Sequence, residues 1–324
     1  MNRLKTLFIL ILICMAATSG AQQTNTGTTK VKPKVIRITP AATDTMLSGQ
    51  KSTKKLSGDS MYNVSDPTVN NAPRDAQAVV YFNNGFAKAK KGDYTGAIED
   101  FTKSIELVKN VNVYLKRSSA YLMVGKYPQA IADASEVIKL KPSLLDAYFI
   151  RGVSRFEVGE YMGSREDLTY FTARDKTNPA AFNYLAALLF MNKEYNEALQ
   201  QYSEVIKINP EFPDIYTNRG MMFHYKQDYL SAIQDYNEAL KLNPKNVTAY
   251  NNRGAARLML KDFKGSVEDF TQAIALDSNN ANAYDNRGRA KQALGDSIGA
   301  CEDWRAAVSH GLKASQDLIT EFCE

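Results

Sequence analysis

The chain has 324 residues, of which 40 are Lys or Arg and 35 are Asp or Glu, and its apolar fraction is 44%. This apolar fraction is sufficient for a large buried core and too high for a fully disordered chain. Two histidines and three cysteines disfavour multi-histidine metal sites and a small disulfide-stapled fold. The net charge of +5 belongs to the leading segment, because residues 78–324 hold 30 bases and 31 acids. It is therefore poor evidence for nucleic-acid binding by the folded part.

Residues 1–21 have the pattern of a secretory signal peptide. Two basic residues precede an apolar run of eleven residues, 7–17, and small residues follow up to Ala21. A membrane anchor is the alternative, but eleven residues span only ~16 Å as a helix and a bilayer core needs about twenty. A lipoprotein modified at Cys14 is a third alternative, although the residue before it is large. We expect export with cleavage after Ala21, to the periplasm or the outer membrane.

Residues 22–77 follow as a predicted disordered, basic tail. They are rich in Thr, Lys, Ser, Asn and Pro and show no helical period. The β-prone run Val-Ile-Arg-Ile at 35–38 is the exception. This run is either an incidental apolar patch or a docking peptide, for a partner or for the protein's own groove.

From residue 78 the chain repeats one motif every 34 residues. Seven units without insertions begin at Ala78, Val111, Leu145, Pro179, Pro213, Val247 and Ala281, and only the first has 33 residues. In each unit, apolar and small residues recur at helical spacing in two segments, which predicts two helices, A and B. Position 8 is small (Gly85, Ser118, Gly152, Ala186, Gly220, Gly254, Gly288), and position 24 is mostly large (Phe101, Ala134, Leu168, Tyr202, Tyr236, Phe270, Trp304).

These residues resemble the tetratricopeptide repeat, which has two antiparallel helices in 34 residues, a small residue at 8, Ala at 20, aromatics at 17 and 24, and Pro at 32. The resemblance covers residues 78–314 and implies an all-α fold, a right-handed superhelical solenoid of seven helix-turn-helix repeats. Pro is missing at position 32 in four units. The last unit departs further from the motif, for example at Ser297, as is common in a terminal repeat. Residues 315–324 have the apolar spacing of a capping helix.

Positions 7 and 23 carry a charge pattern beyond the family motif. Arg at 7 and Asp at 23 occur together in five units, and the fourth unit has neither. Pairing with the next unit would place Asp167 opposite Leu185, so we expect pairing within each unit, from helix A to helix B. The predicted structural ion pairs are Arg117–Asp133, Arg151–Asp167, Arg219–Asp235, Arg253–Asp269 and Arg287–Asp303.

In the family, helix A lines a concave groove that holds a peptide or a partner helix. The resemblance implies that several apolar residues of this chain lie in such a groove. The repeat motif does not require them, which suggests an adaptable hydrophobic binding surface. The residues are Phe149, Val153, Phe156, Phe190, Met191, Met221, His224 and Tyr225. The alternative is that some of them pack against neighbouring helices.

Position 6 is Asn in three consecutive units, at Asn218, Asn252 and Asn286. The run resembles the asparagine ladder of repeat-containing glycosyltransferases, since a side-chain amide can donate to and accept from a peptide backbone. Contacts between repeats are an equal alternative. The carboxylate clamp of eukaryotic chaperone-binding repeats needs Lys at position 5, so binding of a chaperone tail is not implied. That position holds Phe82, Leu115, Phe149, Asn183, Thr217, Asn251 and Asp285.

Two cysteines remain after removal of the signal peptide, Cys301 in helix B of the last repeat and Cys323 near the chain end. A capping helix packed on the last repeat brings them within disulfide range, and an exported protein meets an oxidising compartment. We therefore expect a disulfide. Separate burial of two small residues is the alternative.

The sequence predicts a non-catalytic protein-interaction scaffold of the bacterial cell envelope, which binds an unidentified protein or peptide in its groove. No Gly-x-Ser-x-Gly, Cys-x-x-Cys or His-Glu-x-x-His motif is present, and we expect no enzyme activity, cofactor or metal. We expect no nucleic-acid partner and at most peripheral membrane contact. The alternative function is association with an anionic membrane or cell-wall polymer through the basic tail, at ~1 kcal/mol per Lys.

Overall fold

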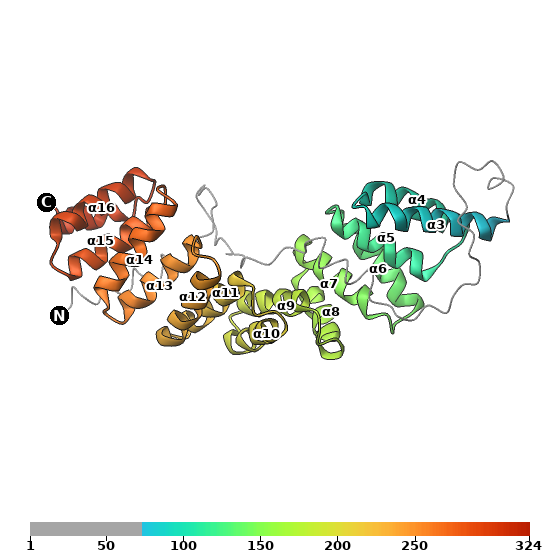
Figure 1. Ribbon diagram of the computed structural model, residues 1–324, viewed down its shortest axis with the longest axis horizontal. Helices are drawn as coiled ribbons and strands as arrows, with labels where there is room; N and C mark the ends of the chain where they lie inside the picture. The colour runs from blue at the N-terminus through green and yellow to red at the C-terminus, as the bar shows by residue number, and fades with distance from the viewer. Residues whose placement is uncertain (1–72) are drawn as a thin grey trace. The chain divides into compact units, whose positions relative to one another are not determined.

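A computed structural model describes residues 73–324, and within this range it contains fifteen α-helices and no strand (Figure 1). The predicted signal peptide and nearly all of the predicted tail lie outside the described residues. The helices are α3 (Arg74–Lys90), α4 (Tyr94–Leu107), α5 (Val111–Met123), α6 (Tyr127–Leu140), α7 (Leu145–Val158), α8 (Tyr161–Arg174), α9 (Pro179–Met191), α10 (Tyr195–Ile208), α11 (Pro213–Tyr225), α12 (Tyr229–Leu242), α13 (Val247–Met259), α14 (Phe263–Leu276), α15 (Ala281–Ala293), α16 (Ser297–Ser309) and α17 (Ser315–Phe322). The predicted all-α class is confirmed.

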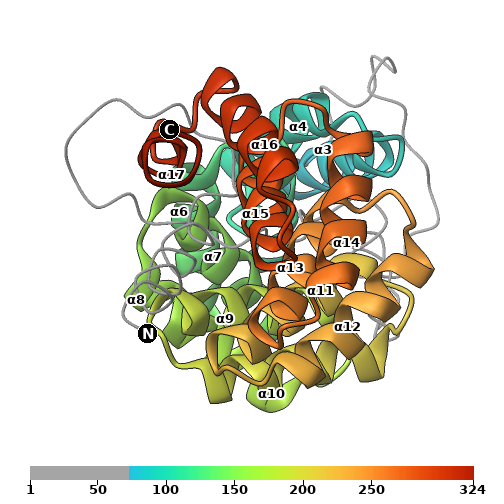
Figure 2. The ribbon, with the colours of Figure 1, turned by 90° about the vertical axis from the view of Figure 1, so that its left-hand side faces the viewer.

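The described residues form two compact units, 73–188 and 189–324, and the boundary lies inside α9. In the first unit, α3 packs on α4, α5 on α6 and α7 on α8, and each pair packs on the next. In the second unit, α11 packs on α12, α13 on α14 and α15 on α16 in the same way. The short helix α17 packs against α16 at the C-terminal end of this unit (Figure 2).

Helix starts follow the repeat register. Six of the seven helices A begin at the first residue of a repeat, and all seven helices B begin at position 17. Four helices B have an Asp at the N-cap whose carboxylate accepts a hydrogen bond from the backbone N–H three residues later, which satisfies a helix N-terminal donor. These caps are Asp93, Asp228, Asp262 and Asp296.

The first helix differs from the expected boundary. Helix α3 begins at Arg74, four residues inside the segment predicted to be disordered. The physical reason is local. Pro73 is the N-cap residue and has the fixed φ that suits a helix start, and Asp75 places a negative charge in the first turn.

The turn between helices A and B is left-handed at position 15 in every repeat. Gly92, Gly125, Gly159 and Gly295 have φ between 74° and 88° there. The other three repeats have Lys193, Gln227 and Lys261 with φ of 62–64°. Glycine is favoured at such a site because it has no Cβ, so the three larger residues show that helix packing imposes the turn.

In five repeats a glycine at position 8 faces a large side chain at position 24. A methyl group at Gly220 would lie 2.6 Å from Cε1 of Tyr236, and one at Gly288 would lie 2.6 Å from Nε1 of Trp304. Both large side chains are fully buried. The missing Cβ at position 8 thus allows helices A and B to approach closely. None of the helices between residues 73 and 324 has the length and apolar character needed to cross a membrane.

Candidate functional site on the inner helices

In the first unit, the three predicted groove residues of α7 belong to the packed interior. Phe149, Val153 and Phe156 are exposed by 0%, 1% and 3%. The Phe149 ring lies 5.3 Å from that of Phe171, and the Phe156 ring lies 5.2 Å from that of Tyr184. The structure therefore places these side chains in contacts between helices, not on an open hydrophobic surface.

In the second unit, the predicted groove residues form an aromatic cluster. The Phe190 ring lies 6.1 Å from that of Tyr195 and 5.4 Å from that of Tyr225, and the Tyr195 and Tyr225 rings stack at 5.4 Å. Phe190 is buried, whereas Met191, Met221 and Tyr225 are half-buried. Met191, Met221 and Tyr225 are therefore the part of the predicted groove in this unit that a partner could touch.

His224 is the buried member of this group, at 7% exposure. Its ring meets that of Tyr229 edge-on at 4.9 Å, and its Nδ1 has no hydrogen-bond partner. Burial lowers the pKa of His224 to about 4, because the charged imidazolium would lose its hydration. The imidazole is therefore neutral at neutral pH and contributes apolar surface.

The predicted asparagine positions are largely buried as well. Asn218, Asn252 and Asn286 are exposed by 5%, 6% and 8%. Asn286 Oδ1 and the neighbouring Asn251 Oδ1 accept no hydrogen bond. An unpaired buried amide oxygen is costly, and both atoms are shielded by the surrounding side chains.

A buried ion pair on α15 was missed by the sequence analysis. Arg289 Nε lies 2.7 Å from Asp285 Oδ2, and the two side chains are exposed by 4% and 1%. Ser315 at the start of α17 donates to Asp285 Oδ1 at 2.7 Å, and Trp304 Nε1 donates to the Asp285 carbonyl at 3.2 Å. The sequence did contain a signal for this pair. The last repeat has opposite charges four residues apart, at positions 5 and 9, where the other repeats have few charges. Arg289 Nη1 remains without a partner.

The five Arg–Asp pairs lie within their repeats, from helix A to helix B. In each pair, Nε and Nη2 of the Arg bond the two carboxylate oxygens of the Asp sixteen residues later. Nη1 also bonds a polar side chain in the preceding helix B; these partners are Thr102, Ser135, Ser203, Asn237 and Thr271. The hydrogen bond to Asp raises the pKa of Arg151, Arg219 and Arg287. These charges connect repeats and are not a reactive centre.

Four repeats place a cation one helical turn after position 7 against the Asp at position 23, and in the seventh this cation is Lys291, whose Nζ lies 2.9 Å from Asp303 Oδ2. In the first repeat Lys88 Nζ lies 2.8 Å from Asp100 Oδ2, one helical turn after the position where the other repeats have Arg. In the third and sixth repeats a second Arg joins the pair, since Arg155 Nη1 lies 2.8 Å from Asp167 Oδ2 and Arg257 Nη1 lies 2.9 Å from Asp269 Oδ2. This second cation was not predicted.

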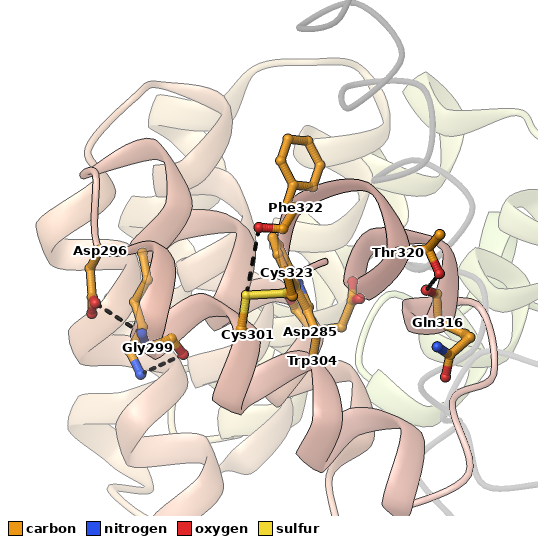
Figure 3. Close-up of a disulfide and its surroundings, with 10 residues drawn as sticks. Asp285, Asp296, Gly299, Cys301, Trp304, Gln316, Thr320, Phe322 and Cys323 are labelled. Atoms are coloured by element: carbon orange, nitrogen blue, oxygen red, sulfur yellow. Dashed lines mark hydrogen bonds between the residues drawn. A yellow bond between two sulfur atoms is a disulfide. The ribbon is translucent and has the colours of Figure 1, made fainter.

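The C-terminal helix is tied to the last repeat by a disulfide. Cys301 and Cys323 are bonded, with a Cα–Cα separation of 5.8 Å (Figure 3). Beside the disulfide, the Trp304 ring lies 5.7 Å from that of Phe322. Leu318 and Ile319 of α17 are buried in the same cluster, so the bridge holds α17 over the end of the array. Within residues 73–324 no cluster of His, Cys, Asp and Glu is arranged to hold a metal ion.

Comparison with known proteins agrees with this helix-pair architecture. The TPR repeat family model matches residues 188–224 and 220–261. Residues 188–261 thus match the tetratricopeptide repeat family. A tetratricopeptide repeat protein from Parabacteroides merdae is 16% identical, with a TM-score of 0.52 over 76% of this chain and 99% of that one. YrrB, described as a TPR protein with an unusual peptide-binding site, is 19% identical, with a TM-score of 0.54 over 57% of this chain and 96% of that one. Both share the fold.

The curated relatives match only part of this chain. Heat shock protein STI1 of Saccharomyces cerevisiae is 32% identical over 103 residues, which is 31% of this chain and 18% of STI1. Serine/threonine-protein phosphatase 5 of Homo sapiens is 35% identical over 103 residues, which is 32% of this chain and 20% of the phosphatase. The chain thus spans about a fifth of the length of these relatives.

Proposed function

We propose that this array is a non-catalytic scaffold that binds an extended peptide of a protein partner. The peptide would lie on helices A, the first helix of each repeat, within residues 189–324. The carrying observation is that Met191, Met221 and Tyr225 remain half-buried on the first helices of neighbouring repeats in this unit. Apolar side chains of adaptable shape supply contact area for a partner peptide.

The relatives support a protein-binding role, and the sequence disfavours one class of partner. YrrB is described as having a peptide-binding site, and STI1 is a heat shock protein. A chaperone carboxylate tail is disfavoured here because position 5 carries no Lys; in the second unit it holds Thr217, Asn251 and Asp285.

Binding of displayed random peptides to the full chain tests the site. Met221→Asp should weaken the selected peptides at least about tenfold, because a charge replaces apolar contact area on α11. Leu230→Asp is the matched control, since Leu230 is an apolar residue of the same repeat that is 67% exposed on α12. If the Met221→Asp variant binds the peptides as the wild type does and unfolds at the same temperature, the binding site does not include Met221. Phe190→Asp is not a useful variant because Phe190 is buried.

We further propose that the protein is exported to the bacterial cell envelope. The signal-peptide pattern of residues 1–21 and the disulfide between Cys301 and Cys323 support this location. N-terminal sequencing of the mature protein should begin at Gln22. An intact N-terminus together with reduced cysteines would contradict export. Surface association through the basic tail is tested by deleting residues 22–72, which leaves α3 complete, and measuring retention on anionic vesicles.

A further inference from the structure

Helix α3 carries a stripe of side chains that remains accessible in the first unit. Residues three or four positions apart share one face of a helix, and here they are Val79, Phe82, Phe86 and Lys90. Val79 is 52% exposed, whereas Phe82 and Phe86 are half-buried. The two Phe rings stack at 6.3 Å, and both pack against the core of the first two repeats. The exposed part of this stripe is therefore apolar surface that a partner could touch.

Two ammonium groups lie beside the same ring of this stripe. Lys90 Nζ lies 4.7 Å from the centroid of the Phe86 ring. Lys116 Nζ, from the neighbouring helix α5, lies 5.9 Å from the same centroid. Lys90 is exposed and Lys116 is half-buried. The face of an aromatic ring attracts cations, so both charges are held next to the apolar surface of α3.

Neither of these two lysines forms an ion pair within residues 73–324. Lys88, on the opposite face of α3, differs in this respect, because its Nζ lies 2.8 Å from Asp100 Oδ2. Burial lowers the pKa of Lys116, and the negative charge of Asp146 on α7 offsets this effect only in part. Lys116 is therefore a partly dehydrated cation, which a carboxylate from a partner would stabilise.

The charge of the two units favours an acidic partner for the first. Residues 73–188 hold 16 bases and 13 acids, whereas residues 189–324 hold 15 bases and 19 acids. The two lysines occupy positions 6 and 13 of their repeats, and in the other repeats these positions carry a single charge, that of Glu157. The repeat motif therefore does not require Lys90 or Lys116. A positive unit with two unpaired cations beside apolar surface is complementary to an acidic segment that also has apolar side chains.

We propose that the accessible face of α3, together with Lys116 of α5, binds an acidic segment of a protein partner. Apolar side chains of the segment cover Phe82 and Phe86, and Asp or Glu side chains beside them pair with the two ammonium groups. Position 5, where the carboxylate clamp has its Lys, holds Phe82 and Leu115 in these repeats, so the segment needs no free terminal carboxylate. The site lies within residues 73–188, and the inference does not depend on the peptide site proposed in residues 189–324.

Fluorescence anisotropy of a labelled peptide with the full chain tests the two cations. The peptide is acetylated and amidated, and glutamates flank a central Leu-Phe pair. Its binding should weaken as the salt concentration rises. Lys90→Met and Lys116→Met should each weaken binding about threefold, and the double variant about tenfold. Met keeps an unbranched apolar stem beside Phe86. Lys103→Met is the matched control, because it removes the same charge from the first repeat, where Lys103 Nζ lies 5.5 Å from the Tyr81 ring.

A further variant tests the apolar part of the site. Val79→Asp should weaken binding at least about tenfold, because it removes apolar surface and repels the glutamates. Its thermal unfolding should match that of the wild type, since Val79 is 52% exposed. Met221→Asp should leave this binding unchanged, so that failure of this site and failure of the site in residues 189–324 can be told apart.

Four outcomes would overturn the proposal. The first is the absence of binding, and the second is equal affinity for a peptide with Gln in place of Glu. The third is binding that persists in the double variant of Lys90 and Lys116. The fourth is binding to phosphatidylglycerol vesicles, lost in the double variant, without binding to the peptide, which would assign this surface to a membrane.

Discussion

Arg117 and Asp133 are joined by two parallel hydrogen bonds, Nε to Oδ2 at 2.7 Å and Nη2 to Oδ1 at 2.8 Å. The third guanidinium nitrogen, Nη1, bonds Thr102 of the preceding repeat at 3.0 Å. The third repeat has the same arrangement at Arg151, but there Arg155 also bonds Asp167 at 2.8 Å. The two repeats therefore differ in whether the buried Asp has a second cation.

Arg117→Met should destabilise the protein by about 3–5 kcal/mol, because it leaves Asp133 buried without a counter-charge. Arg151→Met should cost distinctly less, since Arg155 still neutralises Asp167. Urea unfolding followed by circular dichroism measures both free energies. Equal costs would show that the second cation contributes nothing.

Stability should fall between pH 7 and pH 5 because of His224. Its pKa falls from 6.5 to about 4 on burial in the folded state. The stability contribution is complete above about pH 6.5 and is lost as the pH falls toward 4, because only the unfolded chain then binds the proton. The expected loss between pH 7 and pH 5 is about 2 kcal/mol from this residue. It is measured by urea unfolding at both pH values.

His224→Phe should remove this part of the pH dependence, since the ring packs edge-on against Tyr229 and makes no hydrogen bond through Nδ1. His310→Gln is the matched control, because His310 is the chain's other histidine and is exposed. A His224→Phe protein with the wild-type pH profile would contradict the assignment.

Gly220→Ala should destabilise the fifth repeat although Ala is the better helix former. The new methyl group would lie 2.6 Å from Tyr236 Cε1, and Tyr236 is 0% exposed and has no room to move. Overpacking of this kind costs about 1–3 kcal/mol, against roughly 1 kcal/mol gained in helix propensity. At Gly254 the nearest ring atom is 3.1 Å away, so Gly254→Ala should cost less. Thermal unfolding ranks the two, and the reverse order would contradict the packing argument.

Reduction of the disulfide should release α17 from the last repeat. Closing a loop of this size contributes ~3 kcal/mol in the chain-entropy model. Trp304 is the only tryptophan of the chain and packs on Phe322, so its emission should shift to longer wavelength when α17 leaves. The double variant Cys301→Ser and Cys323→Ser should show the shifted emission without reductant and no further response to it. Two free thiols per mature chain under denaturing, non-reducing conditions would exclude the bridge.

The repeat register and the contacts inside one repeat could be read from the amino-acid sequence. The start of each helix B, the small residue facing a large one, and the pairing of Arg117 with Asp133 all recur at fixed separations along the chain. Such contacts are readable because seven copies of one local geometry carry the same residue types in the same positions. The Arg287–Asp303 pair follows from the same recurrence, whereas the bridge between Cys301 and Cys323 was expected because a capping helix on the last repeat brings the two residues together.

Which residues on the first helix of each repeat remain accessible depends on the packing between repeats. Phe149 and Met221 occupy comparable apolar positions in the sequence, yet the first is fully buried and the second half-buried. The buried pair of Asp285 and Arg289 and the second cation on Asp167 also appeared only in the structure. These features depend on how closely neighbouring helices pack, and that distance is set by side chains from different repeats acting together, which no single repeat position encodes.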